Sequence, residues 1–277
     1  MTDNAVYSMK VAIEEARASL RKGSHGFGAV IIRENRVVVR AHDTRESGTD
    51  SRGHAEMVAI RKACRLIGRN LSSCAIVCTH EPCGSCAEAI VTARIRAVAY
   101  GCCAAEAEAG RVFRNAMIVV EKGIMKEECS ILYNREVRKE LEKLRGASDD
   151  QLRIQDRERE ARRIEWYQSQ SWPRKGDPLE KAYRVLLRKL RIQEDQAPVV
   201  RRDQSTLVFR SRNFCPTLEV CKILGMDTRR VCRLSNESST DALVRQVDGR
   251  LAFTRNYEKI RLYSEYCEES VSYRGLS

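Results

Sequence analysis

One short stretch of the chain, from His54 to Cys86, brings together an imidazole, a carboxylate and two thiols. It opens with His54-Ala55-Glu56 and closes with Pro82-Cys83-Gly84-Ser85-Cys86. Imidazole nitrogen and thiolate sulfur are ligands that zinc prefers, at about 2.0–2.3 Å. Three protein ligands leave the fourth tetrahedral position for water, which is typical of a catalytic zinc site. The sequence therefore predicts that His54, Cys83 and Cys86 bind one zinc ion.

Glu56 lies two residues after His54 and is not part of this ligand set. Zinc lowers the pKa of its bound water from near 16 to about 7, so a nucleophile is available at neutral pH. His-x-Glu followed by Pro-Cys-x-x-Cys resembles the signature of zinc deaminases. Their reaction, removal of an amino group from an aromatic ring, also needs a proton on the adjacent ring nitrogen and later one on the departing ammonia. A single carboxylate beside the water can carry both protons. We therefore expect Glu56 to be the catalytic proton shuttle.

The cysteines also allow other interpretations. A Cys-x-x-Cys pair alone is typical of a redox pair or of half a structural zinc site. Cys74, Cys78 and His80 are the nearest additional ligands, and with Cys83 they could complete a four-ligand site. However, Cys74 and Cys78 lie on a short apolar run that indicates a buried strand. The combination of motifs favours the catalytic interpretation.

The hydrophobic pattern predicts strands that alternate with helices. We expect helices over residues 4–21, 54–67, 83–93 and 130–144, and strands over 26–32, 36–41, 74–79, 95–100 and 117–120. A polar loop is expected over 42–52, and a loop or short helix over 104–114. This order predicts the α/β class, as a three-layer α/β/α domain with about five strands.

The composition changes after Arg145, which suggests a second domain. The sequence predicts a catalytic domain over residues 1–146, a charged, solvated helical linker over 147–177, and a smaller α+β domain of unknown role over 178–277. In this last part we expect a helix over 179–190, a strand over 206–209, a helix from Pro216 to Leu224 ended by Gly225, and a short helix after Asp227. It also contains Cys215, Cys221, Cys232 and Cys267. Their spacings match no familiar ligand pattern, which favours buried core positions and leaves a metal site as the alternative.

Charge and hydropathy narrow the class of protein. The 277-residue chain has a net charge of +12, spread evenly over its two halves. That charge allows attraction to polyanions such as RNA, although a charged solvated surface explains it more simply. No run of eighteen apolar residues is present, so we expect no membrane span. The N-terminal residues lack the pattern of a signal peptide, so we expect a cytoplasmic protein whose cysteines are reduced.

These motifs resemble the cytidine deaminase superfamily, in particular the branch of tRNA adenosine deaminases, guanine deaminases and fungal-type cytosine deaminases. The resemblance covers about residues 1–140 and includes Gly26-Phe27-Gly28-Ala29-Val30, His54-Ala55-Glu56-Met57-Val58-Ala59-Ile60-Arg61, Glu81-Pro82-Cys83 with Cys86, and Ala93-Arg94-Ile95. It implies a five-stranded α/β/α core, a homodimer, one zinc per subunit and hydrolytic release of ammonia. It also implies zinc ligation by His54, Cys83 and Cys86, with Glu56 as the shuttle.

Three further residues are expected to contact the substrate: Asp43, Phe27 and Ala55. The family commonly has Gly-His-Asn where this chain has Ala41-His42-Asp43. An ionised Asp43 accepts hydrogen bonds but cannot donate them, so we hypothesise that it pairs with a ring N–H or a ribose hydroxyl. A solvated loop aspartate is the alternative. Phe27 is placed to stack on a base, or else is a core strand residue.

The substrate is less well defined by the sequence. The tRNA branch usually has Asp-x-Lys-x-Gly after the fourth strand, whereas Ala105 to Gly110 contains no lysine, which argues against bacterial-type anticodon deamination. Our first hypothesis is therefore a zinc-dependent deaminase of a small-molecule nucleobase, nucleoside or nucleotide. The alternative within the same chemistry is an RNA-editing adenosine or cytidine deaminase that binds RNA through its basic C-terminal region. A third is an inactive partner subunit or binding module.

Overall fold

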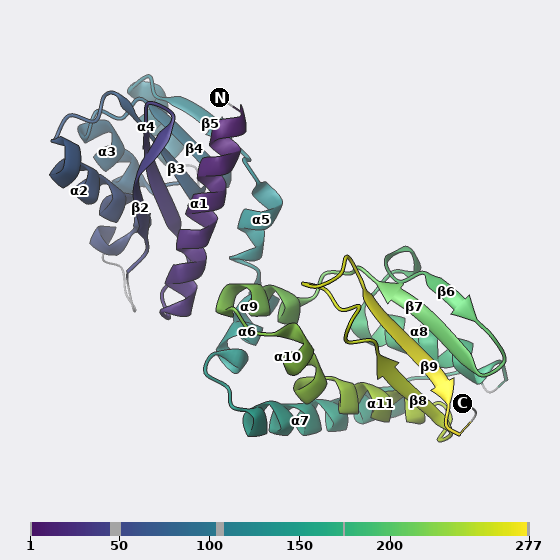
Figure 1. The fold of residues 1–277 in the computed structure, drawn as a ribbon. Helices are drawn as coiled ribbons and strands as arrows, with labels where there is room; N and C mark the ends of the chain where they lie inside the picture. The colour runs from purple at the N-terminus through teal and green to yellow at the C-terminus, as the bar shows by residue number, and fades with distance from the viewer. Residues whose placement is uncertain (1, 45–50, 104–107, 174, 276–277) are drawn as a thin grey trace. The chain divides into compact units, whose positions relative to one another are not determined.

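A five-stranded mixed sheet forms the centre of the first of two units, Met1–Lys139, in the computed structural model (Figure 1). The structure describes residues 2–44, 51–103, 108–173 and 175–275. The strands are β1 (Gly28–Arg33), β2 (Arg36–His42), β3 (Cys74–His80), β4 (Ala97–Cys102) and β5 (Val119–Lys122), in the order β2-β1-β3-β4-β5. Strand β1 is antiparallel to β2 and β3, while β3, β4 and β5 are parallel. All five expected strands are present, each within about two residues of its predicted bounds.

Helices cover both faces of this sheet, so the three-layer α/β/α architecture is confirmed. Helix α1 (Thr2–Arg21) lies on one face, against β1, β2 and β3. Helices α2 (Ala55–Ile67), α3 (Gly84–Thr92) and α4 (Glu108–Asn115) enclose a hydrophobic core on the other face. Large members of that core are Ile31, Ile76, Tyr100 and Phe113.

Helix α1 packs very closely on β1 because the strand begins with a glycine. A Cβ atom at Gly28 would lie only 1.9 Å from the backbone oxygen of Ala12. The facing helix positions Ala12 and Ala16 are also small and fully buried. Close approach of the two backbones therefore depends on the absence of side-chain atoms at this one strand position.

Two of the expected loops lie only partly within the described residues. Residues 45–50 of the polar loop and residues 104–107 of the later segment lie outside them. The second segment continues as α4, so its helical alternative holds for Glu108–Asn115.

The expected closing helix over 130–144 is wrong as a single element. The structure has α5 (Lys126–Ile131) and α6 (Arg135–Leu144), separated by a short break. Asn134 begins the second helix, because its side-chain oxygen accepts hydrogen bonds from the backbone N–H groups of Glu136 and Val137 at 2.9 and 3.2 Å. Asn134 is an N-cap residue that signals the start of a new helix. Hydrophobic periodicity alone did not reveal this start.

The second unit, Glu140–Ser277, has an antiparallel sheet with the order β6-β7-β9-β8. Its strands are β6 (Val199–Arg202), β7 (Thr206–Ser211), β8 (Leu251–Arg255) and β9 (Cys267–Tyr273). Helices α8 (Pro178–Leu190) and α11 (Glu237–Arg245) pack on this sheet and share its hydrophobic core. Helices α9 (Pro216–Leu224) and α10 (Thr228–Ser235) complete the unit. The expected α+β class is confirmed, and Gly225 ends α9 in the left-handed conformation with φ 68°.

Helix α7 (Asp149–Gln168) corresponds to the expected linker helix but is not a solvated spacer. It packs against α10 and α11, and Leu152, Asp156 and Arg163 are buried. Arg163 Nη1 donates hydrogen bonds of 2.7 Å to the hydroxyls of Ser239 and Thr240. The buried side of this helix is largely polar, so the spacing of apolar residues could not predict that α7 packs against other helices.

None of the helices within the described ranges is both long enough and apolar enough to span a lipid bilayer.

Candidate zinc centre

The three expected zinc ligands come together at the N-terminal ends of two helices. His54 is the N-cap residue of α2, Cys83 is the N-cap residue of α3, and Cys86 lies in the first turn of α3. The Nδ1 atom of His54 lies 3.3 Å from the Sγ of Cys86 and 3.4 Å from the Sγ of Cys83. Nitrogen and sulfur ligands of a tetrahedral zinc ion lie about 3.5 Å apart. The donor set and its spacing therefore fit zinc.

The fold explains why these groups meet. Strands β3 and β4 are parallel, so α3, which joins them, begins beside the carboxyl end of β3. Crevices outside the carboxyl ends of parallel strands are the usual ligand sites of such sheets. Pro82 precedes the N-cap Cys83 and cannot extend the ladder of β3. The strand-to-helix turn thus presents both thiols at the sheet edge.

The site favours negative charge on sulfur. Hydrogen bonds lower the pKa of Cys83 to about 3, with the largest effect from Cys86 and the next largest from His54. The Cys83 thiolate, together with burial, raises the pKa of Cys86. One thiolate is therefore favoured beside one neutral thiol, and a bound cation would favour the thiolate form of both. This is the behaviour expected of two sulfurs that share a metal.

Glu56 is buried beside the thiols, with only 7% of its surface exposed. It lies in the first turn of α2, and its Oε2 atom accepts a hydrogen bond of 3.7 Å from Cys86 Sγ. Burial raises the pKa of Glu56 to about 6, although its backbone hydrogen bond and His54 act in the opposite direction. A carboxyl group with a pKa near neutrality both accepts and releases protons readily. Its location and chemistry fit the expected shuttle.

Phe27 belongs to a group of three rings that the sequence did not reveal as a group. Its ring lies 5.1 Å from that of Tyr133 and 5.7 Å from that of His80. Tyr133 is held by a hydrogen bond of 2.8 Å between its hydroxyl group and Thr79 Oγ1. All three rings are partly buried. Tyr133 lies in the break between α5 and α6, which is why the single-helix prediction concealed it.

Asp43 follows β2 and is fully buried, so the solvated-loop alternative is wrong. Its Oδ1 atom lies 3.5 Å from His25 Nδ1, and its backbone N–H donates a hydrogen bond of 2.9 Å to Phe27 O. Ala55 is also buried, with its methyl group in the hydrophobic core. Any contact of Ala55 with a substrate would use its backbone N–H, which is unpaired within a first helical turn.

The alternative metal ligands do not join the group. Among the described residues, His54, Cys83 and Cys86 form the only cluster of histidine, cysteine and acidic side chains with metal-ligand spacing. Cys74 and Cys78 are buried core residues of β3. Of the four cysteines of the second unit, Cys221 is buried, whereas Cys215, Cys232 and Cys267 are only partly buried, so the expected core position holds for Cys221.

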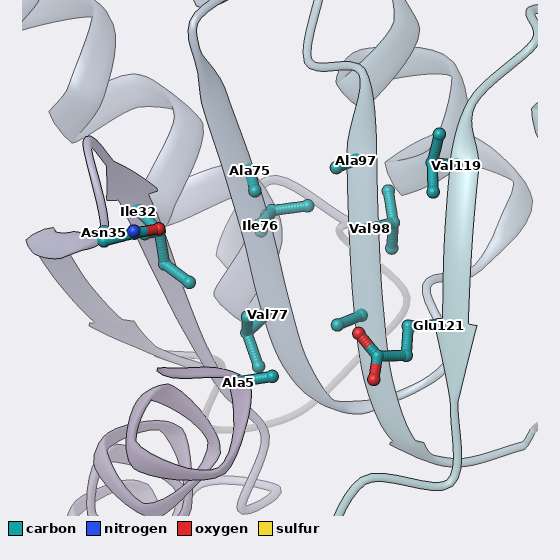
Figure 2. Close-up of a pocket in the computed structure, with 11 residues that line it drawn as sticks. Ala5, Ile32, Asn35, Ala75, Ile76, Val77, Ala97, Val98, Val119 and Glu121 are labelled. Atoms are coloured by element: carbon teal, nitrogen blue, oxygen red, sulfur yellow. The ribbon is translucent and has the colours of Figure 1, made fainter. Parts of the chain in front are cut away.

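A second hollow in the first unit is separate from this centre. It is a groove of about 90 Å³ over β1, β3, β4 and β5, beside the start of α1 (Figure 2). Its lining is mainly apolar and includes Ala5, Val77 and Val119. None of the zinc-ligand candidates lines it, so it is not part of the candidate site.

Comparison with known proteins identifies the family. Residues 2–102 match the family model described as the cytidine and deoxycytidylate deaminase zinc-binding region. A tRNA-specific adenosine deaminase from Aquifex aeolicus is 39% identical over 95 residues, which are 34% of this chain and 63% of that protein. A tRNA-specific adenosine deaminase from Bacillus subtilis is 33% identical over 151 residues, covering 50% of this chain and 93% of that protein.

A solved structure from work on A-to-I editing by tRNA:A34 deaminases is 30% identical, with a TM-score of 0.43. It covers 46% of this chain and 98% of that one. The residues that match the family model include His54, Cys83 and Cys86. The chain therefore belongs to the cytidine and deoxycytidylate deaminase family of zinc-binding hydrolytic enzymes.

Proposed function

We propose that the chain deaminates adenosine within tRNA, converting it to inosine with release of ammonia. The observation that carries this substrate is the match to the tRNA-specific adenosine deaminase of Bacillus subtilis over 93% of its length. This reverses the preference expressed by the sequence motifs, which placed free nucleobases and nucleosides first. The missing lysine between Ala105 and Gly110 remains a departure from the tRNA branch.

The residues of the centre divide the chemistry between them. We propose that His54, Cys83 and Cys86 hold zinc, which when bound supplies a Lewis acid that activates water near neutral pH. Glu56 takes a proton from the attacking water and passes it to the ring nitrogen next to the amino-bearing carbon. The carbon–oxygen bond forms, the carbon–nitrogen bond breaks, and Glu56 delivers a second proton to the departing ammonia. One water is consumed for each ammonia released.

Two further groups are proposed to orient the base. The Phe27 ring, held between His80 and Tyr133, offers an aromatic wall for the flipped-out base. Asp43, whose Oδ1 lies 3.5 Å from His25 Nδ1, offers an acceptor for a ring N–H or a ribose hydroxyl. We also propose that the enzyme is cytoplasmic and homodimeric and that its substrate is RNA.

A free-base or nucleoside deaminase is the second candidate. It is favoured by the buried acid at Asp43, where the family commonly has asparagine. The two candidates differ in the size of their substrate, so turnover of isolated nucleosides separates them.

The decisive experiment measures inosine in tRNA by nucleoside mass spectrometry and ammonia from adenosine, cytidine, adenine, guanine and cytosine. We expect inosine in tRNA and little ammonia from the free compounds. Glu56→Gln keeps the shape of the side chain and should lower the rate by about 100- to 10,000-fold while zinc content remains at one per chain. Activity that survives this substitution would remove Glu56 from its role. Turnover of a free compound with no inosine in tRNA would establish the second candidate.

A further inference from the structure

The connection between β8 and β9, residues 256–266, contains three tyrosines. The guanidinium group of an arginine lies over the ring of each one. The guanidinium carbon of Arg233 lies 4.3 Å from the ring centroid of Tyr257, and that of Arg229 lies 4.0 Å from that of Tyr263. Arg210 lies 4.4 Å from the ring centroid of Tyr266. We name this set the Arg–Tyr surface: Arg210, Arg229, Arg233, Tyr257, Tyr263 and Tyr266.

Contacts within the second unit hold this surface together. Arg229 and Arg233 are four residues apart on α10, so their side chains share one helix face. Thr228 Oγ1 donates a hydrogen bond of 3.0 Å to the backbone oxygen of Arg261, which ties the connection to the start of α10. The hydroxyl of Tyr263 donates a hydrogen bond of 2.9 Å to Asp227 Oδ1. The arginines are therefore presented by a fixed framework.

Arg229 and Arg233 of α10 also differ in charge pairing from other exposed arginines of the second unit. Arg153, Arg184 and Arg250 each form an ion pair with a nearby carboxylate. Within the described part of the chain, neither Arg229 nor Arg233 has an acidic partner at ion-pair distance, and both are exposed. The two acids next to α10 in the sequence are hydrogen-bonded to the tyrosines, Asp227 to Tyr263 at 2.9 Å and Glu237 to Tyr257 at 2.8 Å. Two cationic groups are thus left free to face an anion.

Exposed apolar side chains lie in the same connection and in the turn that is hydrogen-bonded to it. Phe214, Leu262 and Tyr263 are 47%, 44% and 49% exposed. Arg261 Nη1 donates a hydrogen bond of 2.5 Å to the backbone oxygen of Asn213, so the turn that carries Phe214 contacts the same connection. Leu262 has φ 88°, a conformation that is costly for a leucine and that often marks functional surfaces.

We propose that the Arg–Tyr surface, together with Phe214, binds an unpaired segment of RNA. Arg229 and Arg233 contact phosphates, while bases stack on the guanidinium planes and on the exposed ring of Phe214. Cations paired with flat rings suit the phosphates and bases of a single strand, whereas a protein partner would need carboxylates at matching positions. The inference rests on the proposed RNA substrate and adds a separate binding surface in the second unit.

Equilibrium binding of the full chain to a fluorescent RNA stem-loop with an unpaired loop, over a range of salt concentrations, tests this inference. The double variant Arg229→Gln/Arg233→Gln should bind about tenfold more weakly, and the slope of log affinity against log salt should fall by about 1.4, or about 0.7 for each lost phosphate contact. The same variant should bind a fully paired duplex about as well as the unaltered chain does.

The matched control is Arg153→Gln/Arg162→Gln, which removes the same charge from exposed α7 positions that pair with Asp150 and Glu158. It should bind the stem-loop within about twofold of the unaltered chain. Thermal unfolding of both variants establishes that they are folded. Equal weakening in both variants would mean only diffuse attraction and would overturn the inference, as would unchanged binding in the α10 variant.

This test distinguishes failure of the RNA-binding inference from failure of the proposed catalytic function. Binding is measured without turnover, so a chain that binds through these arginines but forms no inosine in tRNA overturns the proposed function alone. A chain that forms inosine and whose α10 variant binds RNA normally overturns the inference alone. Loss of a co-purifying protein from the α10 variant, with RNA binding unchanged, would identify a protein interface and also overturn it.

Discussion

Two buried carboxyl groups of the first unit have different surroundings and, we infer, different roles. Glu56 lies against the thiols, and burial raises its pKa to about 6, which suits proton transfer. Asp43 lies 3.5 Å from His25, which suits a fixed acceptor. In the second unit, Glu269 forms a buried ion pair with Arg255, whereas Glu265 is exposed and pairs with Arg212.

Asp43→Asn should alter substrate choice more than zinc binding, because the substitution adds a donor at a buried acceptor position without touching a zinc ligand. We expect at least a tenfold change in the ratio of rates for adenosine and guanosine or cytidine substrates, about the effect of one hydrogen bond. Rates and zinc content are measured on the same samples. If both fall together, Asp43 has only a structural role.

Glu269→Gln should destabilise the second unit by about 3–5 kcal/mol, because it leaves the Arg255 guanidinium buried without a counter-charge. Urea unfolding measures the change. Glu265→Gln is the control: Glu265 pairs with Arg212 at 3.6 Å but is 87% exposed, so its loss should cost less than about 0.5 kcal/mol. Similar costs for both substitutions would contradict the importance of burial.

At the level of elements, the first unit depends on how closely α1 approaches β1 and on where α2 and α3 begin. The helix starts bring His54 and Cys83 within 3.4 Å of one another. The close approach of α1 depends on Gly28, since a side-chain carbon there would collide with the backbone of Ala12.

Gly28→Ala should destabilise the first unit by about 1–3 kcal/mol, because backbone atoms of α1 cannot move aside cheaply. Gly110→Ala provides the comparison within a helix. Among the described residues, the atom closest to a Cβ at Gly110 lies 3.5 Å away and is the flexible end of Arg114. This change should stabilise the chain by up to about 1 kcal/mol through helix propensity. Thermal or urea unfolding distinguishes the two, and a neutral Gly28→Ala would show that α1 is not tightly packed.

At the scale of the whole molecule, the chain consists of two units, each with its own sheet and hydrophobic core. The candidate zinc centre belongs entirely to the first unit. The Arg–Tyr surface belongs entirely to the second.

Removal of zinc should therefore destabilise one unit selectively. Chelation is expected to lower the stability of the first unit by about 3–4 kcal/mol, if the free metal concentration before chelation is 100 to 1,000 times its dissociation constant. Calorimetry should show one transition shifted to lower temperature and the other unchanged. A single transition that shifts as a whole would show that the two units unfold together.

The sequence by itself predicted the candidate zinc ligands and the acid at Glu56, and it determined the five strands of the first sheet and the α+β class of the second unit, because these follow from local spacing and periodicity. Short-range signals also located the end of α9 at Gly225. Only the tertiary structure decided the grouping of Phe27, His80 and Tyr133, the burial of Asp43 and the polar packing of α7. These features depend on contacts between residues far apart in the chain, and polar or isolated aromatic side chains carry no periodic signal that would reveal such partners.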